Sequence, residues 1–245
     1  MREKIMEPES GLRVYPEPAD VFVAEQVELL RRHLHPLISI DLGQVNAGWS
    51  GWVHLLSPVE PVAGYLGDHT DAFHSPLQTT NWLGFAVEDD RYRMVGDIRY
   101  FQRATTPDEV PDPWGGFRAD LDEHCEDEER SYLAHRETYQ REGSLIRLDL
   151  DGSLLYGVRT DVPLLDQLGG DPPGGNWEDE DLFPLDVEPG DRFHAGRVWP
   201  ISPAGNRFHF VASVPGWHYR HQGADSILLF FEPVERLALL TFDWG

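Results

Sequence analysis

The chain has 245 residues, of which 43 are acidic and 20 basic, so its formal net charge is −23 at pH 7. Such a charge opposes binding to nucleic acids and to anionic membranes, because phosphate contacts need Lys and Arg side chains. It favours a basic protein partner instead. A solubilising surface, or adaptation to a salty cytoplasm, explains the same charge equally well.

The single lysine and the single cysteine exclude further kinds of site. Lys4 is the only lysine, so no lysine is available for a P-loop, a kinase phosphate contact or a Schiff base unless Lys4 itself folds into a site. Cys125 is the only cysteine, which excludes an internal disulfide. No apolar run is long enough to span a bilayer, and the N-terminus lacks the apolar core of a signal peptide. We therefore expect a cytoplasmic protein.

The N-terminal part predicts a leader, a helix and then strands. Residues 1–18 contain three prolines, which break regular structure, so they predict a loose leader. Asp20 can cap a helix that runs to about His35, since apolar residues recur on one helical face and Pro36 then stops it. The strands expected next are residues 37–42, 51–56, 82–87 and 92–102, with a loop over 64–80 and a hairpin turn at 88–90.

The middle of the chain predicts one long polar helix. Residues 105–116 are a Pro- and Gly-rich connector, and residues 119–142 form a helix that Gly143 ends. The first half of this helix is strongly acidic, which suits the helix dipole. A solvated face explains these acids more simply than a binding surface does. Asp151 and Gly152 predict a hairpin turn, and a second acidic, turn-rich segment covers residues 159–206.

The last third carries the densest apolar content and predicts three strands. Residues 208–214 alternate apolar and polar side chains with a period of two. Residues 227–231 are a short continuous apolar run, which is typical of a strand buried on both faces. Residues 237–242 form a third strand after a turn at 232–235, where Pro233 cannot donate to a sheet. We expect these strands at the centre of a sheet.

Histidines are the natural candidates for catalysis, in two loops over residues 67–74 and 217–221. Four of them could meet in one pocket, namely His69, His74, His218 and His221. With an acid behind them they could serve a small-ligand protein or a metal-dependent hydrolase, although their spacing matches no metal-binding signature. Other enzyme motifs are absent. Acidic neighbours should raise the pKa of the Cys125 thiol, so we do not expect a nucleophile there.

The 217–221 loop lies between two expected core strands and is rich in aromatic and imidazole groups. Trp217, His218, Tyr219 and His221 could form a recognition patch. Packing of the turn over the sheet is the simpler explanation.

Part of the C-terminal third resembles the YwqG-like family of uncharacterised bacterial proteins. The resemblance rests on Leu168-Gly169-Gly170-Asp171-Pro172, on Trp177, and on the strands at residues 208–214 and 227–231. It departs from the family at Ala212-Ser213-Val214, where members tend to have Gln-Ile-Asp. The resemblance implies a strongly bent mixed sheet and no established activity. It also implies an immunity role, because such proteins are often encoded near secreted bacterial toxins.

Together these patterns predict an α+β fold with a mixed, mostly antiparallel bent sheet, one N-terminal helix and one polar mid-chain helix. We expect a single domain over residues 19–245. The functional hypothesis is an acidic binding protein without a cofactor or metal, an immunity protein that neutralises a basic toxin; its oligomeric state stays open. The residues expected to bind the partner are Asp120, Asp122, Glu123, Glu126, Asp127, Glu178, Asp179, Glu180, Asp181, Trp217, His218, Tyr219 and His221.

Overall fold

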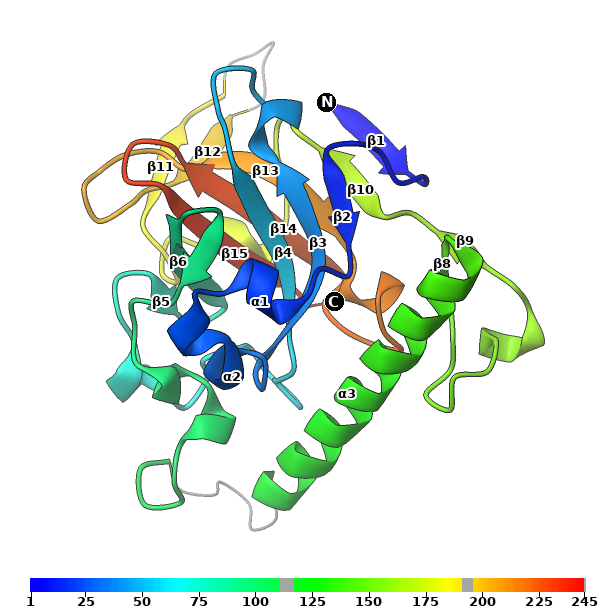
Figure 1. Cartoon of the computed structure of the whole chain (residues 1–245). Helices are drawn as coiled ribbons and strands as arrows, with labels where there is room; N and C mark the ends of the chain where they lie inside the picture. The colour runs from blue at the N-terminus through cyan, green and yellow to red at the C-terminus, as the bar shows by residue number, and fades with distance from the viewer. Residues whose placement is uncertain (111–116, 191–195, 245) are drawn as a thin grey trace.

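The computed structural model describes residues 1–110, 117–190 and 196–244. Within these ranges the larger sheet has eight strands, and every strand pair in it is antiparallel. Its order is β1 (Arg2–Ile5), β10 (Leu165–Leu168), β13 (His209–Val214), β14 (Ser226–Glu232), β15 (Leu237–Asp243), β6 (Trp82–Glu88) and β5 (Gln78–Thr79), with β7 (Arg91–Arg93) also paired to β6. The three C-terminal strands lie at its centre, as predicted (Figure 1).

A second sheet packs against one face of the larger one. It contains β2 (Leu12–Val14), β3 (Leu34–Asp41) and β4 (Trp52–Pro58), again antiparallel. Two small strand pairs lie outside both sheets, β8 (Leu145–Ile146) with β9 (Asp161–Val162) and β11 (Leu185–Glu188) with β12 (Arg197–Pro200). The predicted α+β fold with mostly antiparallel sheets is therefore confirmed.

Alternation along β14 divides the interior into two cores. Ile227, Leu229 and Phe231 point into the larger core, which β3 and β4 share. Leu228 and Phe230 point to the opposite face, where they meet a second core with several aromatic rings. Successive side chains of a strand point to opposite faces, so the continuous apolar run reports burial on both sides.

The long helix α3 (Phe117–Glu142) confirms the predicted mid-chain helix and crosses the lower right of Figure 1. Gly143 ends it with φ of +75°, and its amide donates to the Tyr139 carbonyl at 2.8 Å. This left-handed residue is the usual helix terminator, because glycine has no Cβ to clash there. No helix among the described residues is both long enough and apolar enough to cross a membrane.

The predicted N-terminal helix is broken into short pieces. Helix α1 (Pro18–Val21), a 3-10 turn at Ala24–Gln26 and helix α2 (Val27–Leu30) take its place. Phe22 is extended, fully buried and bridged to Tyr92, and the Val23 amide donates to the Tyr92 carbonyl. The chain then enters β3 before Pro36, which lies where the β3–β4 register shifts. Burial of Phe22 in the core outweighs local helix periodicity here.

The loose leader predicted for residues 1–18 is wrong for two segments. Strand β1 pairs with β10, and β2 pairs with β3. Ile5, Leu12 and Tyr15 are buried in the larger core. The prolines fall between and after the two strands, where they interrupt no sheet hydrogen bond.

The remaining segments follow the predictions in part. The β6–β7 hairpin turns at Asp89 and Asp90, which both have positive φ as a two-residue turn requires. Its second strand ends at Arg93, earlier than expected, and 3-10 turns follow at Ile98–Tyr100 and Gln102–Ala104. The turn at 151–152 also forms. The remaining 3-10 turns are Leu42–Gln44, Asp71–Phe73, Leu155–Gly157, Asn176–Glu178 and Gly216–His218.

Candidate functional site

The outer face of α3 carries the first acidic segment. Asp120, Asp122, Glu123 and Glu126 are exposed. Asp127 is half-buried and pairs with Arg130 at 2.9 Å. Asp122 lies 3.9 Å from Arg103. Among the described residues, Asp120, Glu123 and Glu126 form no ion pair, although Glu126 lines a surface groove together with Arg103 and Arg130.

The second acidic segment lies on the other side of the larger sheet. Glu178, Asp179, Glu180 and Asp181 are exposed there, next to the 3-10 turn at Asn176–Glu178. Trp177 anchors this turn in the second core, with its ring centroid 5.4 Å from that of Phe230. Helix α3 instead anchors in the larger core through Tyr132. The two acidic segments, which the sequence grouped into one interface, are therefore anchored in different cores on opposite faces of the larger sheet.

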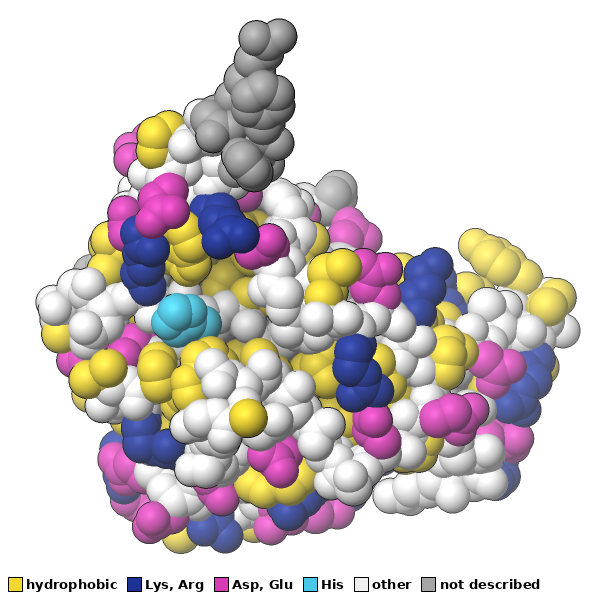
Figure 2. All heavy atoms as spheres, turned by 90° about the horizontal axis from the view of Figure 1, so that it is seen from above, with side chains coloured by type: hydrophobic (Ala, Val, Ile, Leu, Met, Phe, Trp, Pro, Cys, Tyr) yellow, Lys and Arg dark blue, Asp and Glu magenta, His cyan; other side chains and the backbone are white. Residues whose placement is uncertain are grey.

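Acids are interspersed with other side chains elsewhere on the surface. On the face that Figure 2 shows, Asp and Glu side chains alternate with Lys and Arg side chains and with apolar ones. A surface of that kind fits a solubilising role. The α3 face is also mixed, because Asp122 lies 3.9 Å from Arg103 and Asp127 2.9 Å from Arg130.

The centre of the 217–221 loop, from His218 to Arg220, is buried, whereas Trp217 and His221 are partly exposed. Tyr219 is fully buried, and its hydroxyl donates to the Leu164 carbonyl at 2.8 Å. His218 is 3% exposed and lies 2.9 Å from the Pro163 carbonyl, through Nδ1. Trp217 packs against the larger core with the Arg147 guanidinium 4.4 Å from its ring. The prediction that Tyr219 and His218 contact a partner is therefore wrong, because neither is accessible.

The four histidines proposed for a hydrolase have separate neighbours. His69 is exposed. His74 Nε2 lies 3.0 Å from the Gly67 carbonyl. His218 contacts Pro163, and His221 lies 3.7 Å from Asp149. In the described parts of the chain, no three His, Cys, Asp or Glu side chains are placed to hold a metal ion. The convergence that this alternative requires is not seen.

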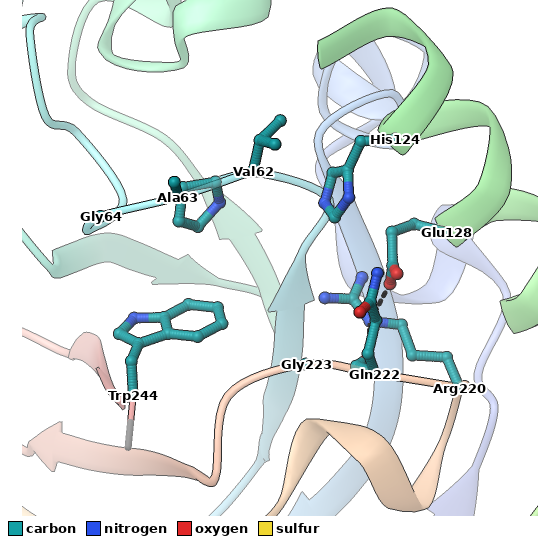
Figure 3. A pocket seen from close by; sticks show the side chains of 10 residues that line it. Val62, Ala63, Gly64, His124, Glu128, Arg220, Gln222, Gly223 and Trp244 are labelled. Carbon is teal, nitrogen blue, oxygen red and sulfur yellow. Dashed lines mark hydrogen bonds and ion pairs between the residues drawn. The ribbon is translucent and has the colours of Figure 1, made fainter. Parts of the chain in front are cut away.

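A hollow of about 330 Å³ instead lies between α3 and the C-terminal end of β15. His124 and Glu128 project into it from α3, Gln222 comes from the loop before β14, and Trp244 forms the opposite wall (Figure 3). Residues 61–64 form its rim. Its volume is at the small end of the range of about 300–1,000 Å³ typical of ligand pockets.

The hollow contains a buried ion pair. Arg220 and Glu128 have side-chain exposures of 2% and 1%, and Arg220 Nε lies 2.6 Å from Glu128 Oε2. The Arg220 guanidinium also donates to the Pro58 carbonyl at 2.7 Å and to the Gln222 carbonyl at 2.8 Å. Burial lowers the pKa of Arg220, and the Glu128 charge opposes that shift. Arg220 thus joins three separate segments of chain.

The Glu128 carboxylate has open acceptor positions. The Arg220 Nε–H bond is directed at the Gln222 carbonyl, so the close approach to Glu128 is an ion pair without good hydrogen-bond geometry. Neither carboxylate oxygen accepts a hydrogen bond from a described residue, although both are buried. A buried polar atom without a hydrogen bond costs about 1–3 kcal/mol, so a bound donor at this position is favoured.

Burial keeps the neighbouring imidazoles neutral. The pKa of His124 is lowered by burial first and by the Arg220 charge, while Glu128 and a backbone bond to Val59 raise it. Burial likewise lowers the pKa of His35, whose Nδ1 lies 3.3 Å from Arg220 Nη1. The groups around Arg220 therefore add no further positive charge at neutral pH.

Two other buried groups border this region. Burial raises the pKa of the Cys125 thiol to about 12; the Arg103 charge opposes the shift, and Glu60, Asp122 and Glu128 add to it. The predicted direction holds, but its main cause is burial rather than the acids next to Cys125 in the sequence. Burial also raises the pKa of Glu60 to about 8. Its Oε1 lies 3.9 Å from His33 Nδ1. Glu60 is thus mostly protonated at neutral pH.

Glu128 was missed as a site residue, although its position is predictable. Leu121, Cys125, Tyr132 and Tyr139 are separated by four, seven and seven residues, which places them on one helical face. Position 128 completes this inward face, and so does position 135, where a histidine lies. A charged residue on the buried face of a helix is the signal that could have found the ion pair.

Comparison of the chain with protein-family models, with curated proteins and with solved structures gives no match. The resemblance to the YwqG-like family therefore stays a prediction, as does the cytoplasmic location.

Proposed function

We propose that this chain is a non-enzymatic binding protein that presents the outer face of α3 to a basic protein, and that it acts as an immunity protein against a basic toxin. The observation that supports the proposal is the set of exposed acids without a paired cation on α3, namely Asp120, Glu123 and Glu126. Their charges reinforce the net charge of −23.

A rigid helix suits such an interface. Tyr132 fixes α3 from the inner side, because its hydroxyl donates to the Pro36 carbonyl at 2.7 Å. The buried Glu128–Arg220 pair fixes it one turn earlier. Charges held on a rigid scaffold steer a partner of opposite charge and speed its association. The proposal is limited to α3, since the acids at 178–181 lie on the other side of the larger sheet.

The test is affinity capture from a lysate of the native cell at low ionic strength, followed by a wash at about 0.5 M salt, which screens charges beyond a few ångströms. A basic protein that the salt wash releases supports the proposal. Capture of a neutral or acidic protein that resists the wash contradicts it, and so does the absence of any captured protein.

A further inference from the structure

We infer that the hollow between α3 and Trp244 binds a small, neutral, hydroxyl-bearing ligand of monosaccharide size, with Glu128 accepting hydrogen bonds from its hydroxyl groups. The site is separate from the outer face of α3, and the inference does not depend on a basic protein partner.

The first observation is the state of Glu128. It is fully buried, lines the hollow, and has two carboxylate oxygens that accept no hydrogen bond from a described residue. Hydrogen bonds to a charged acceptor are among the strongest in proteins. Oε2 already lies 2.6 Å from Arg220 Nε, so a ligand hydroxyl that donates to Oε1 would satisfy the oxygen that has no close partner.

The second observation concerns charge. Arg220 already neutralises Glu128 at 2.6 Å, and the His124 imidazole beside them is neutral. The lining of the hollow therefore has no net charge. A ligand cation would meet the Arg220 guanidinium and an anion would meet Glu128, so a neutral ligand suits this site better.

The third observation concerns the Trp244 indole ring, which forms one wall of the hollow. Trp244 Nε1 donates to Asn81 Oδ1 at 3.0 Å, which engages the polar end of the indole. The ring then lies across the hollow from His124 and Glu128 (Figure 3). Gln222 supplies an exposed amide that can both donate and accept. A sugar combines an apolar C–H face for the ring with hydroxyl groups that bond to such side chains.

Ordered water is the competing occupant, since buried waters commonly satisfy such carboxylates. The experiment is saturation-transfer difference NMR with D-glucose, D-galactose, N-acetyl-D-glucosamine and myo-inositol, each at about 10 mM so that weak binding is detected. Ethylammonium chloride serves as the cationic probe. We expect saturation transfer to at least one hydroxylated probe and none to ethylammonium.

Variants connect that signal to the hollow. Glu128→Gln and Trp244→Ala should each weaken binding about tenfold, because each removes a main contact. Glu137→Gln changes an exposed acid elsewhere on α3 and should leave binding unchanged. Circular dichroism checks folding, and Gln222→Ala, on the exposed rim, is the substitute if Glu128→Gln does not fold.

Three results would overturn the inference. One is the absence of transfer to every hydroxylated probe, which would leave water alone in the hollow. Another is transfer to ethylammonium only, which would make the site cationic. The third is sugar binding that survives both the Trp244 and the Gln222 substitutions, which would locate the sugar elsewhere.

Discussion

Helix α3 carries glutamates on both faces, exposed on the outer face and buried on the inner face. On the outer face Glu123 and Glu126 are exposed, and solvent and salt screen them. On the inner face Glu128 is fully buried beside Arg220, and His135 is 3% exposed. Exposed charges contribute little to stability and are free to act on a partner, whereas a buried charge is costly unless it stays paired. The role of each acid follows from its position on the helix rather than from the local density of acids.

The largest effect should come from breaking the buried pair. Glu128→Ala leaves Arg220 charged and buried without its counter-ion, and we expect a loss of about 3–5 kcal/mol in the free energy of unfolding. Urea denaturation measures it. Glu137→Ala, on the exposed side of the same helix, is the control and should change that free energy by less than about 0.5 kcal/mol. Equal losses in both variants would remove the distinction between the two faces.

The next effect concerns His135, whose burial lowers its pKa to about 4. Its Nδ1 lies 2.9 Å from the Ser131 carbonyl, and Nε2 can accept from the Leu148 amide at 3.4 Å, an arrangement that suits the neutral ring. The unfolded chain binds a proton below a pH of about 6.5 that the folded chain takes up only near pH 4. Stability due to this group is therefore present above pH 6.5 and is lost as the pH falls towards 4.

His135→Gln should reduce the loss of unfolding free energy at acid pH, by on the order of 1–2 kcal/mol between pH 7 and pH 5. Urea denaturation at the two pH values gives the difference between the variant and the wild type. Parallel pH dependence in the two proteins would show that His135 titrates normally in the folded state.

Glu60 differs from His135 because burial shifts its pKa in the opposite direction. Its pKa rises to about 8, so the folded chain holds a proton that the unfolded chain loses above a pH of about 4.5. Its contribution is present below pH 4.5 and is lost as the pH rises through about 8. Glu60→Gln should flatten the decline in stability between pH 6 and pH 8 by on the order of 1–2 kcal/mol. An unchanged decline would mean that another group causes it.

The smallest stability effect should come from the outer face. Neutralising Asp120, Glu123 and Glu126 together to amides should shift the free energy of unfolding by no more than about 0.5 kcal/mol per site. Thermal denaturation at low salt and at high salt checks this. A large loss at either salt concentration would indicate that these acids hold the fold together.

Elements with a clear local sequence pattern were predicted correctly. The run at residues 227–231 became β14, and Gly143 ended α3 as expected. Contacts distant in sequence were not predictable. Strand β1 buries only Ile5, and its partner β10 lies some 160 residues further along the chain. Helix periodicity at residues 20–35 failed because Phe22 pairs with Tyr92.

The candidate site likewise has a part that the local sequence could predict and a part that depends on the tertiary fold. The spacing of Leu121, Cys125 and Tyr132 could have identified Glu128 as an inward residue. Its partner Arg220 comes from a loop that the fold alone brings to α3. The exposure of the 120–127 acids was predictable, but their separation from the 178–181 acids depends on which core anchors each segment.

The most direct test of the central claim is side-by-side capture from the native lysate by three forms of the protein. One is the wild type, the second has Asp120→Asn, Glu123→Gln and Glu126→Gln, and the third has Glu178→Gln, Asp179→Asn, Glu180→Gln and Asp181→Asn. The wild type and the third form should capture the same basic protein, and the second form should lose it. Capture by the second form at the wild-type level, or loss by the third form alone, would contradict the account.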